Sequence, residues 1–264
     1  MLIDMHVHMF SDQIAVRALN NLARICKCPY YTDGTVNGTN EKLREWGVNL
    51  CAAMNIATKP AQQAIINNWA ASVRSQSILC FGSVHPDAPN AVDELYRIKE
   101  LNLYGVKLHP DYQDFFIDDE KMFPIYETLS ALELPVTFHT GRDPLSPNLV
   151  HASPTAVAKT ADLFPHMKII AAHLGGLAMY DEVEELLAGK NIFFDTAMSA
   201  RLCPPEQFER IINKHGSEHI LFASDCPWSR SCDEYEYIEK THLCSSDKEN
   251  IYWRNASNLL NLHL

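Results

Sequence analysis

Short apolar runs recur along the chain and alternate with amphipathic stretches. The runs are rich in Val, Ile, Leu and Phe, and their length and composition are typical of buried β-strands. They occupy residues 2–9, 48–56, 78–84, 104–109, 135–139, 168–173, 191–195 and 219–224. The pattern therefore predicts eight strands.

The segments between these runs carry the periodicity of helices. Ser153 followed by Pro154 is a typical helix start, with the serine as N-cap and the proline at the first helical position. Asp118 and Asp119 are available to cap the helix expected within residues 119–134. Helices are expected within residues 60–76, 90–102, 119–134, 153–164, 180–190, 204–216 and 233–243, and a further terminal helix within 245–262.

Strands that alternate with helices pair in parallel, because each helix is the crossover that a parallel pair requires. Eight such units in 264 residues predict an α/β fold of the (β/α)₈ barrel type, a TIM barrel, as a single domain over residues 1–264. A doubly wound open sheet is the alternative. The turn-rich stretch at about 11–47 is longer than a plain crossover, so we expect an insertion after strand 1, near the barrel mouth, that could act as a lid.

Composition and charge narrow the class of protein. The net charge is −11 and no cluster of Lys and Arg occurs, so no nucleic-acid partner is expected. No apolar run approaches the length of a membrane span, and the first residues do not resemble a signal peptide. A cytoplasmic protein is therefore predicted, with its eight cysteines mainly as buried free thiols. Cys26 and Cys28 are only a weak candidate metal pair.

Polar side chains fall at the ends of the predicted strands. His6 and His8 lie two residues apart, which places both rings on one side of a strand, with Asp4 one step deeper on that side. His139, His173 and Asp225 likewise follow later apolar runs. The carboxyl ends of barrel strands form the active site in this architecture.

One histidine at a strand end is usually a hydrogen-bonded structural residue. Four of them in chain order, with an aspartate after the eighth strand, favour a shared site. Imidazole and carboxylate together are typical ligands of Zn²⁺ and similar ions. The sequence therefore predicts a divalent metal, zinc first, as one or two ions.

The motifs IDMHVH, GVKLHP, FHTG, AHLGG and ASDCPW resemble the amidohydrolase superfamily. They are most similar to its amidohydrolase-related branch, which contains aminocarboxymuconate-semialdehyde decarboxylase. The resemblance spans the chain and implies a set of metal ligands, which are His6, His8, His139 and Asp225. It implies that His173 either binds a second ion or acts as general acid and base. Asp225 would also accept the proton of an attacking water.

Lys107 is open to three interpretations. It is a metal ligand only if carboxylated, as the bridging lysine of some superfamily members is. It is otherwise a cation for a substrate carboxylate, or part of a structural ion pair.

Further candidates for substrate contact lie near the strand ends. His109 shares a face with Lys107, Arg142 follows the FHTG motif, and Trp228 follows Asp225 by three residues. An arginine at that position would bind a carboxylate through two hydrogen bonds, or pair with Asp143. His85 is a weaker candidate, and Asp195 is expected either to support the metal ligands or to face the substrate.

These features predict a metal-dependent hydrolase of a small carbonyl compound, such as an amide, lactone or ester, that acts through activated water. The alternative is non-oxidative decarboxylation of a small carboxylic acid on the same site. A deoxyribonuclease and a metal-binding barrel without turnover are weaker alternatives. The expected partner is a small-molecule substrate, and the sequence is compatible with a homo-oligomer.

Overall fold

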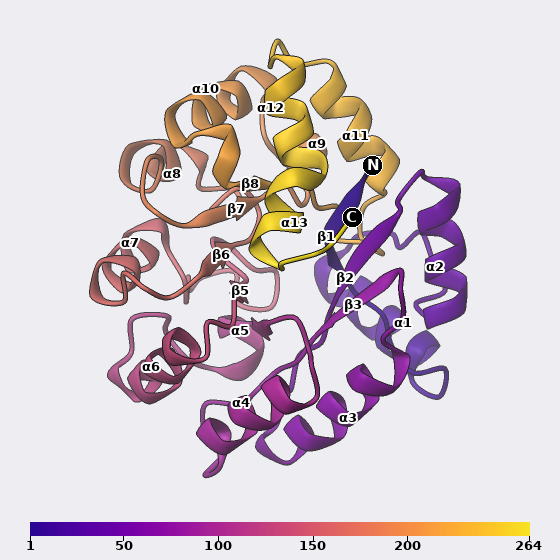
Figure 1. Cartoon of the computed structure of the whole chain (residues 1–264), viewed down its shortest axis with the longest axis vertical. Helices are drawn as coiled ribbons and strands as arrows, with labels where there is room; N and C mark the ends of the chain where they lie inside the picture. The colour runs from indigo at the N-terminus through magenta and orange to yellow at the C-terminus, as the bar shows by residue number, and fades with distance from the viewer.

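A ring of eight short parallel strands forms the centre of the computed structural model, which describes residues 1–264 (Figure 1). Every apolar run predicted as a strand contains one. The strands are β1 (Ile3–Val7), β2 (Leu50–Met54), β3 (Ile78–Phe81), β4 (Val106–Leu108), β5 (Val136–Phe138), β6 (Ile169–Ala171), β7 (Phe193–Asp195) and β8 (Ile220–Leu221).

The strands follow one another in chain order around this ring. Ladders join β1 to β3 and β4 to β8, and single parallel bridges link Gly82 to Val106 and Val7 to Cys226. At the second of these seams the His8 amide donates to the Cys226 carbonyl, at 2.6 Å. The predicted (β/α)₈ barrel is confirmed.

Helices surround the strands on the outside (Figure 1). Their inner faces and the outward strand residues form one large apolar core. The Ser153 hydroxyl caps its helix, as predicted, by accepting from the Ala156 amide. The crossover helices are α3 (Gln63–Val73), α4 (Ala91–Glu100), α5 (Pro110–Gln113), α6 (Phe123–Ala131), α7 (Pro154–Leu163), α8 (Tyr180–Leu186), α9 (Ser199–Leu202), α10 (Pro205–His215) and α11 (Ser231–Glu239), with short 3₁₀ turns at Pro60–Gln62, Glu120–Met122 and Ser217–His219.

The tail packs over one end of the barrel. It consists of α12 (Ser245–Glu249), a π-helical turn (Asn250–Arg254) and α13 (Asn255–Leu259), where the sequence predicts one plain helix. Leu259 joins a second apolar cluster with Met5, Phe81 and other inward strand residues. The opposite end, where the strands finish, therefore holds the polar side chains.

The insertion at residues 11–47 contains two helices, α1 (Ala15–Cys26) and α2 (Val36–Glu45). Residues of both helices line the main cavity of the protein, so the insertion lies near the mouth as expected. Cys26 and Cys28 are joined as a disulfide there. For this pair the prediction of free thiols is wrong; the other six cysteines are free. No helix is both long and apolar enough to cross a bilayer.

Candidate metal centre

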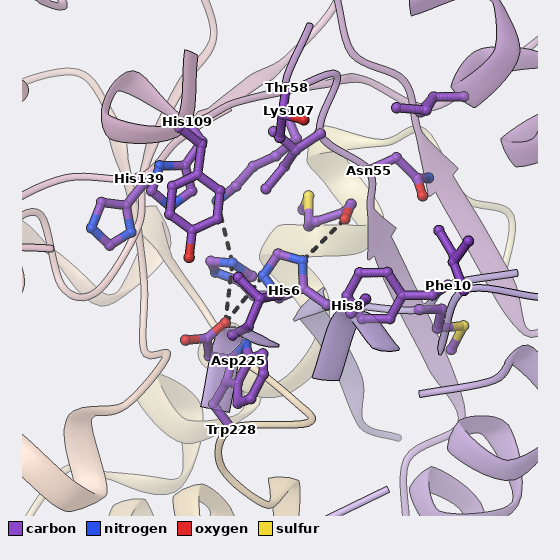
Figure 2. A pocket seen from close by; sticks show the side chains of 18 of the residues that line it. His6, His8, Phe10, Asn55, Thr58, Lys107, His109, His139, Asp225 and Trp228 are labelled. Atoms are coloured by element: carbon purple, nitrogen blue, oxygen red, sulfur yellow. Dashed lines mark hydrogen bonds and ion pairs between the residues drawn. The ribbon is translucent and has the colours of Figure 1, made fainter. Parts of the chain in front are cut away.

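His6, His8 and Asp225 converge at the seam between β1 and β8 (Figure 2). Asp225 Oδ1 lies 3.2 Å from His8 Nε2 and 3.6 Å from His6 Nε2. Ligands bound to one tetrahedral ion at the usual zinc distances lie about 3.4 Å apart. Both distances therefore match the edge of a metal coordination shell, and all three ligand atoms lie within 4.8 Å of one another.

Hydrogen bonds to the far side of each ring fix its orientation. His6 Nδ1 donates to Asp195 Oδ2 at 2.9 Å, and His8 Nδ1 donates to the Met54 carbonyl at 3.1 Å. Both acceptors require the proton on Nδ1, which leaves a lone pair on each Nε2. These are the tautomers that bind a metal.

The donor set fits a divalent metal ion. The His8 Nε2 lone pair faces a carboxylate oxygen at 3.2 Å, and two acceptors this close repel each other unless they share a cation. A third acceptor, His6 Nε2, points to the same oxygen. Three acceptors around one point favour a metal ion over a proton, and imidazole with carboxylate suits zinc and its neighbours.

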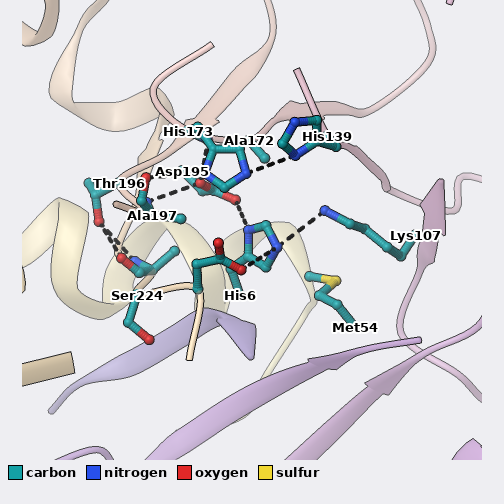
Figure 3. Close-up of polar contacts among 12 residues, drawn as sticks. His6, Met54, Lys107, His139, Ala172, His173, Asp195, Thr196, Ala197 and Ser224 are labelled. Atoms are coloured by element: carbon teal, nitrogen blue, oxygen red, sulfur yellow. Dashed lines mark hydrogen bonds and ion pairs between the residues drawn. The ribbon is translucent and has the colours of Figure 1, made fainter. Parts of the chain in front are cut away.

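Asp195 at the end of β7 connects this cluster to β6 (Figure 3). Its Oδ2 holds His6, while its Oδ1 accepts from the backbone amides of His173 and Ala197, at 2.8 and 3.1 Å. Burial alone would raise the pKa of this carboxyl, but contact with His6 holds it below its usual value. Asp195 therefore stays ionised and supports the ligands, one of the two roles expected for it.

Asp4 does not lie beneath the histidine rings, so that prediction is wrong. The register of β1 shifts between Asp4 and Val7, and the alternation of faces is broken there. The Asp4 carboxylate instead accepts from the hydroxyls of Ser224 and Ser231, at 2.6 and 2.7 Å. Its one link to the ligands is a bond from the His6 backbone amide, at 3.1 Å.

His139 and His173 lie beside the three converging ligands. His173 Nε2 is 3.0 Å from His139 Nδ1, and the ring centres of His173 and His6 are 5.3 Å apart. His139 Nε2 faces away from His6, towards Asp143 Oδ2 at 3.5 Å. Of the five predicted ligands, three thus converge in one group, and His139 and His173 lie beside it.

A second group of possible ligands, His109, His139 and Asp143, adjoins the first. The rings of His109 and His139 are stacked with centres 4.3 Å apart, and His109 Nε2 lies 3.6 Å from Asp143 Oδ2. Asp143 was considered only as a partner for Arg142. Its position four residues after His139 in a short loop is the one sequence signal that it belongs to the site.

Lys107 reaches into the centre of the site rather than its rim. Its Nζ lies 3.2 Å from His6 Nε2, and the side chain is fully buried (Figure 3). Burial lowers the lysine pKa to about 8, although Asp195 and Asp225 oppose the shift. A contact with a substrate carboxylate and a buried structural ion pair with Asp195 and Asp225 are both compatible with this position.

Burial also favours the neutral form of His6 and His173. It lowers the pKa of His173 to about 3 and that of His6 below its usual value. For Asp225 burial acts upward, but His6 and His8 outweigh it and hold the pKa well below the ordinary range. Neutral imidazole and ionised carboxylate are the protonation states of metal ligands.

The backbone at the two proposed catalytic residues is in a rare conformation. His173 and Asp225 both have positive φ, 57° and 68°. Side chains other than glycine occupy this left-handed region at a cost, and such residues gather at functional sites. The sharp turn at the end of each strand directs the side chain to the mouth.

The ligand cluster opens into a cavity of about 1030 Å³ that His109 and Trp228 also line. Tyr112, which the sequence analysis missed, lines it too and stacks on His109 with ring centres 3.8 Å apart. Arg142 is exposed and does not line the cavity; only its carbonyl approaches His139, at 3.3 Å. His85 accepts from the Asp87 amide and does not line the cavity.

This chain is similar to several decarboxylases. A gamma-resorcylate decarboxylase from Polaromonas sp. strain JS666 is 25% identical over 223 residues, 67% of this chain and 68% of that protein. The structure of 5-carboxyvanillate decarboxylase from Sphingomonas paucimobilis superposes with a TM-score of 0.72 at 14% identity, over 99% of both chains. A dihydroxybenzoic acid decarboxylase from Polaromonas sp. JS666, with bound manganese and 2-nitroresorcinol, has a TM-score of 0.72 at 17% identity, over 99% of this chain and 97% of that one.

A family model described as amidohydrolase matches residues 52–262. This range contains His139, His173 and Asp225, each at the end of a barrel strand as the motifs predicted. The chain belongs to the amidohydrolase family.

Proposed function

We propose that this protein catalyses the metal-dependent, non-oxidative decarboxylation of a small hydroxylated aromatic carboxylic acid. The observation that carries the proposal is a buried lysine beside the ligand cluster: Lys107 Nζ lies 3.2 Å from His6 Nε2. A substrate carboxylate at this point meets both the ammonium group and a metal ion. The relatives named above decarboxylate acids of this class.

The reaction breaks the bond between the ring carbon and the carboxyl carbon. The electron pair stays on the ring, CO₂ leaves, and the ring carbon takes up one proton. A divalent ion bound to His6, His8 and Asp225 would supply positive charge to the substrate oxygens. Zinc was predicted, and manganese occurs in one related structure; we propose that either ion fits the site.

The residues of the chain bind the acid and handle the proton. Lys107 orients the carboxylate, and the flat faces of Tyr112 and Trp228 enclose the ring. Asp225 Oδ1 faces His6 and His8, so its other oxygen, Oδ2, is the one that can pass a proton taken from solvent to the ring carbon. The carboxylate is ionised before and after this transfer. His173, which also lines the cavity, relays the proton from solvent towards Asp225 and is neutral again afterwards.

Hydrolysis, which the sequence predicts first, would use the same metal ligands but a different position of the reacting group. It needs a hydroxide directed at a carbonyl carbon rather than a proton directed at a ring carbon. The relatives named above are decarboxylases, so they favour the alternative. Arg142 no longer serves as the carboxylate-binding cation, because its side chain is outside the cavity.

The test is a direct assay of purified protein reconstituted with Zn²⁺ or Mn²⁺. We expect 2,6-dihydroxybenzoate to be converted to resorcinol and CO₂, and a Lys107→Met variant to retain its metal while kcat/KM falls by about 100-fold or more. Lys121→Met, a surface control, should match the unmodified protein. Hydrolysis of a lactone or ester panel with no CO₂ release from any hydroxybenzoate would overturn the proposal.

A further inference from the structure

Helix α3 buries two polar side chains and leaves a large apolar one exposed. It buries the amides Gln63 and Asn67, which are 2% and 0% exposed, while Ile65 is 68% exposed. Asn67 is held in place by Ser83 and Glu94. Trp69 and Val73 are partly buried against the core, but Ile65 is left exposed, whereas a surface helix normally buries its apolar stripe.

The apolar face of α3 lines the same cavity as the metal ligands. Ile65, Trp69 and Val73 recur at four-residue spacing and all border the cavity. Residues at this spacing lie on one side of a helix. The residues of α3 itself that line the cavity are therefore a continuous apolar strip, completed by Ile66.

Helix α1 presents a matching strip to the same cavity. Ile14, which precedes the helix, and then Ala18 and Leu22 follow the same four-residue spacing and border it. Ile14 is 41% exposed. We call the part of the cavity between these two strips the apolar arm. The residues of α1 and α3 that line the cavity carry no charge, although Asp12, Gln13, Thr58 and Gln62 line it beside the starts of these helices.

The apolar arm is continuous with the metal centre. Phe10, Met54 and Ile56 line the stretch between them, and Figure 2 shows Phe10 beside His8, on the side away from His139. A ligand held at the metal would thus extend directly between α1 and α3. This continuity favours a substrate over a separate protein partner as the occupant.

The volume of the cavity is too large for a simple hydroxybenzoic acid. It measures about 1030 Å³, at the upper end of the roughly 300–1,000 Å³ found for drug-sized ligands. A benzene molecule fits in a cavity of about 150 Å³. Most of the space is therefore left over once a single ring is bound at the metal.

We propose that the natural substrate carries an extended apolar substituent, an alkyl or aryl chain, which lies in the apolar arm while the carboxylate is held at the metal. This inference rests on the proposed function. It assigns Ile65, Trp69 and Leu22 as residues that select the substrate by the length of its apolar chain.

The experiment compares 2,6-dihydroxybenzoates that carry hydrogen, methyl, propyl, pentyl or heptyl at the ring position opposite the carboxyl group. We expect kcat/KM to rise by about fourfold for each methylene that becomes buried, until the arm is full. The ratio of heptyl to unsubstituted substrate should fall by about fivefold or more in Ile65→Ser. Val16→Ser is the matched control, because Val16 is exposed on α1 but does not line the cavity.

Calorimetry measures the affinity of the protein for the matching 5-alkylresorcinols, which lack the carboxyl group and are not turned over. This affinity reports on the apolar arm alone. Their affinity should rise with chain length, and less steeply in Ile65→Ser. If no acid in the series is decarboxylated, the proposed function fails, and this binding series alone decides on the arm. Decarboxylation and binding that are both indifferent to chain length would overturn the inference. The inference would also be overturned if Ile65→Ser changed the protein from a dimer to a monomer and left the chain-length ratio unaltered. A second copy of the chain, and not the substrate, would then cover the apolar arm.

Discussion

A single carboxylate, Asp195, sets the geometry of two of the predicted site residues. One oxygen fixes the ring of His6, and the other accepts from the backbone amide of His173. The same contact decides which nitrogen of His6 carries the proton, and hence whether the ring can bind a metal. Asp195 touches neither a substrate nor the proposed ion, so it acts as a positioning residue.

We expect Asp195→Asn to weaken metal affinity by about 10- to 100-fold. The amide keeps the shape of the carboxylate and can still accept from His173, but its NH₂ group favours the wrong tautomer of His6. Competition with a chromogenic chelator measures the affinity, and circular dichroism checks the fold. Asp4→Asn is the control on the strand that carries His6: it should lower stability but leave the affinity within a few-fold. Equal affinities of Asp195→Asn and the unmodified protein would contradict this role.

The sequence predicted some residues of the site well and others poorly, for a physical reason. His6 and His8 follow from strand spacing alone, because side chains two apart share a face. Asp143 and Tyr112 lie in or near loops, where no periodicity fixes the direction of a side chain. Arg142 was misplaced for the same reason: it precedes Asp143, and the loop turns one inward and the other outward.

At the scale of single elements, the strands were predictable and the two helices inside the insertion were not. Each strand is a short apolar run buried on both faces, which leaves a clear signal in sequence. Helix α1 lacks this signal, because its cavity-facing strip is short and its remaining faces are polar. The shift in β1 between Asp4 and Val7 is invisible in the sequence, since it depends on how the neighbouring strand pairs.

The last residue of α10 gives a prediction at this scale. His215 is buried, donates from Nε2 to the Ile192 carbonyl at 2.9 Å, and accepts at Nδ1 from the Gly189 amide at 3.1 Å. A second proton would break the Gly189 bond, and burial lowers the pKa of His215 to about 4. As the pH falls below about 6.5, His215 therefore binds a proton in the unfolded chain but stays neutral in the folded chain. Stability is full above this pH and declines as the pH falls towards 4.

We expect His215 to account for about 2 kcal/mol of the unfolding free energy lost between pH 7 and pH 5. His215→Leu should be less stable at pH 7, because two backbone groups lose their partner, but should lose less on acidification. Urea unfolding at the two pH values measures this difference. His166→Gln removes an exposed histidine and should leave the acid loss unchanged. An equal acid loss in His215→Leu and the unmodified protein would contradict the assignment.

At the scale of the whole molecule, the metal centre lies on a seam of the barrel. The first and last strands are joined there by one bridge, Val7 with Cys226, and a few backbone hydrogen bonds. His6 and His8 come from one side of the seam and Asp225 from the other. A bound ion would tie the two ends of the chain together across one of the two seams of the ring that have a single bridge.

Removal of metal should therefore destabilise the whole protein and not only abolish activity. An ion at 100 times its dissociation constant adds about 2.7 kcal/mol to the folded state, which for a domain of this size is roughly 5–10 °C in Tm. Thermal unfolding after chelation, and again after reconstitution with Zn²⁺ or Mn²⁺, measures the shift. His8→Ala removes one ligand, and its Tm should respond much less to added metal. Hydrogen exchange should show the largest loss of protection in β1 and β8, because the ion joins only those strands. If chelated and reconstituted protein melt together, or if protection is lost evenly around the barrel, the three residues do not bind an ion across this seam.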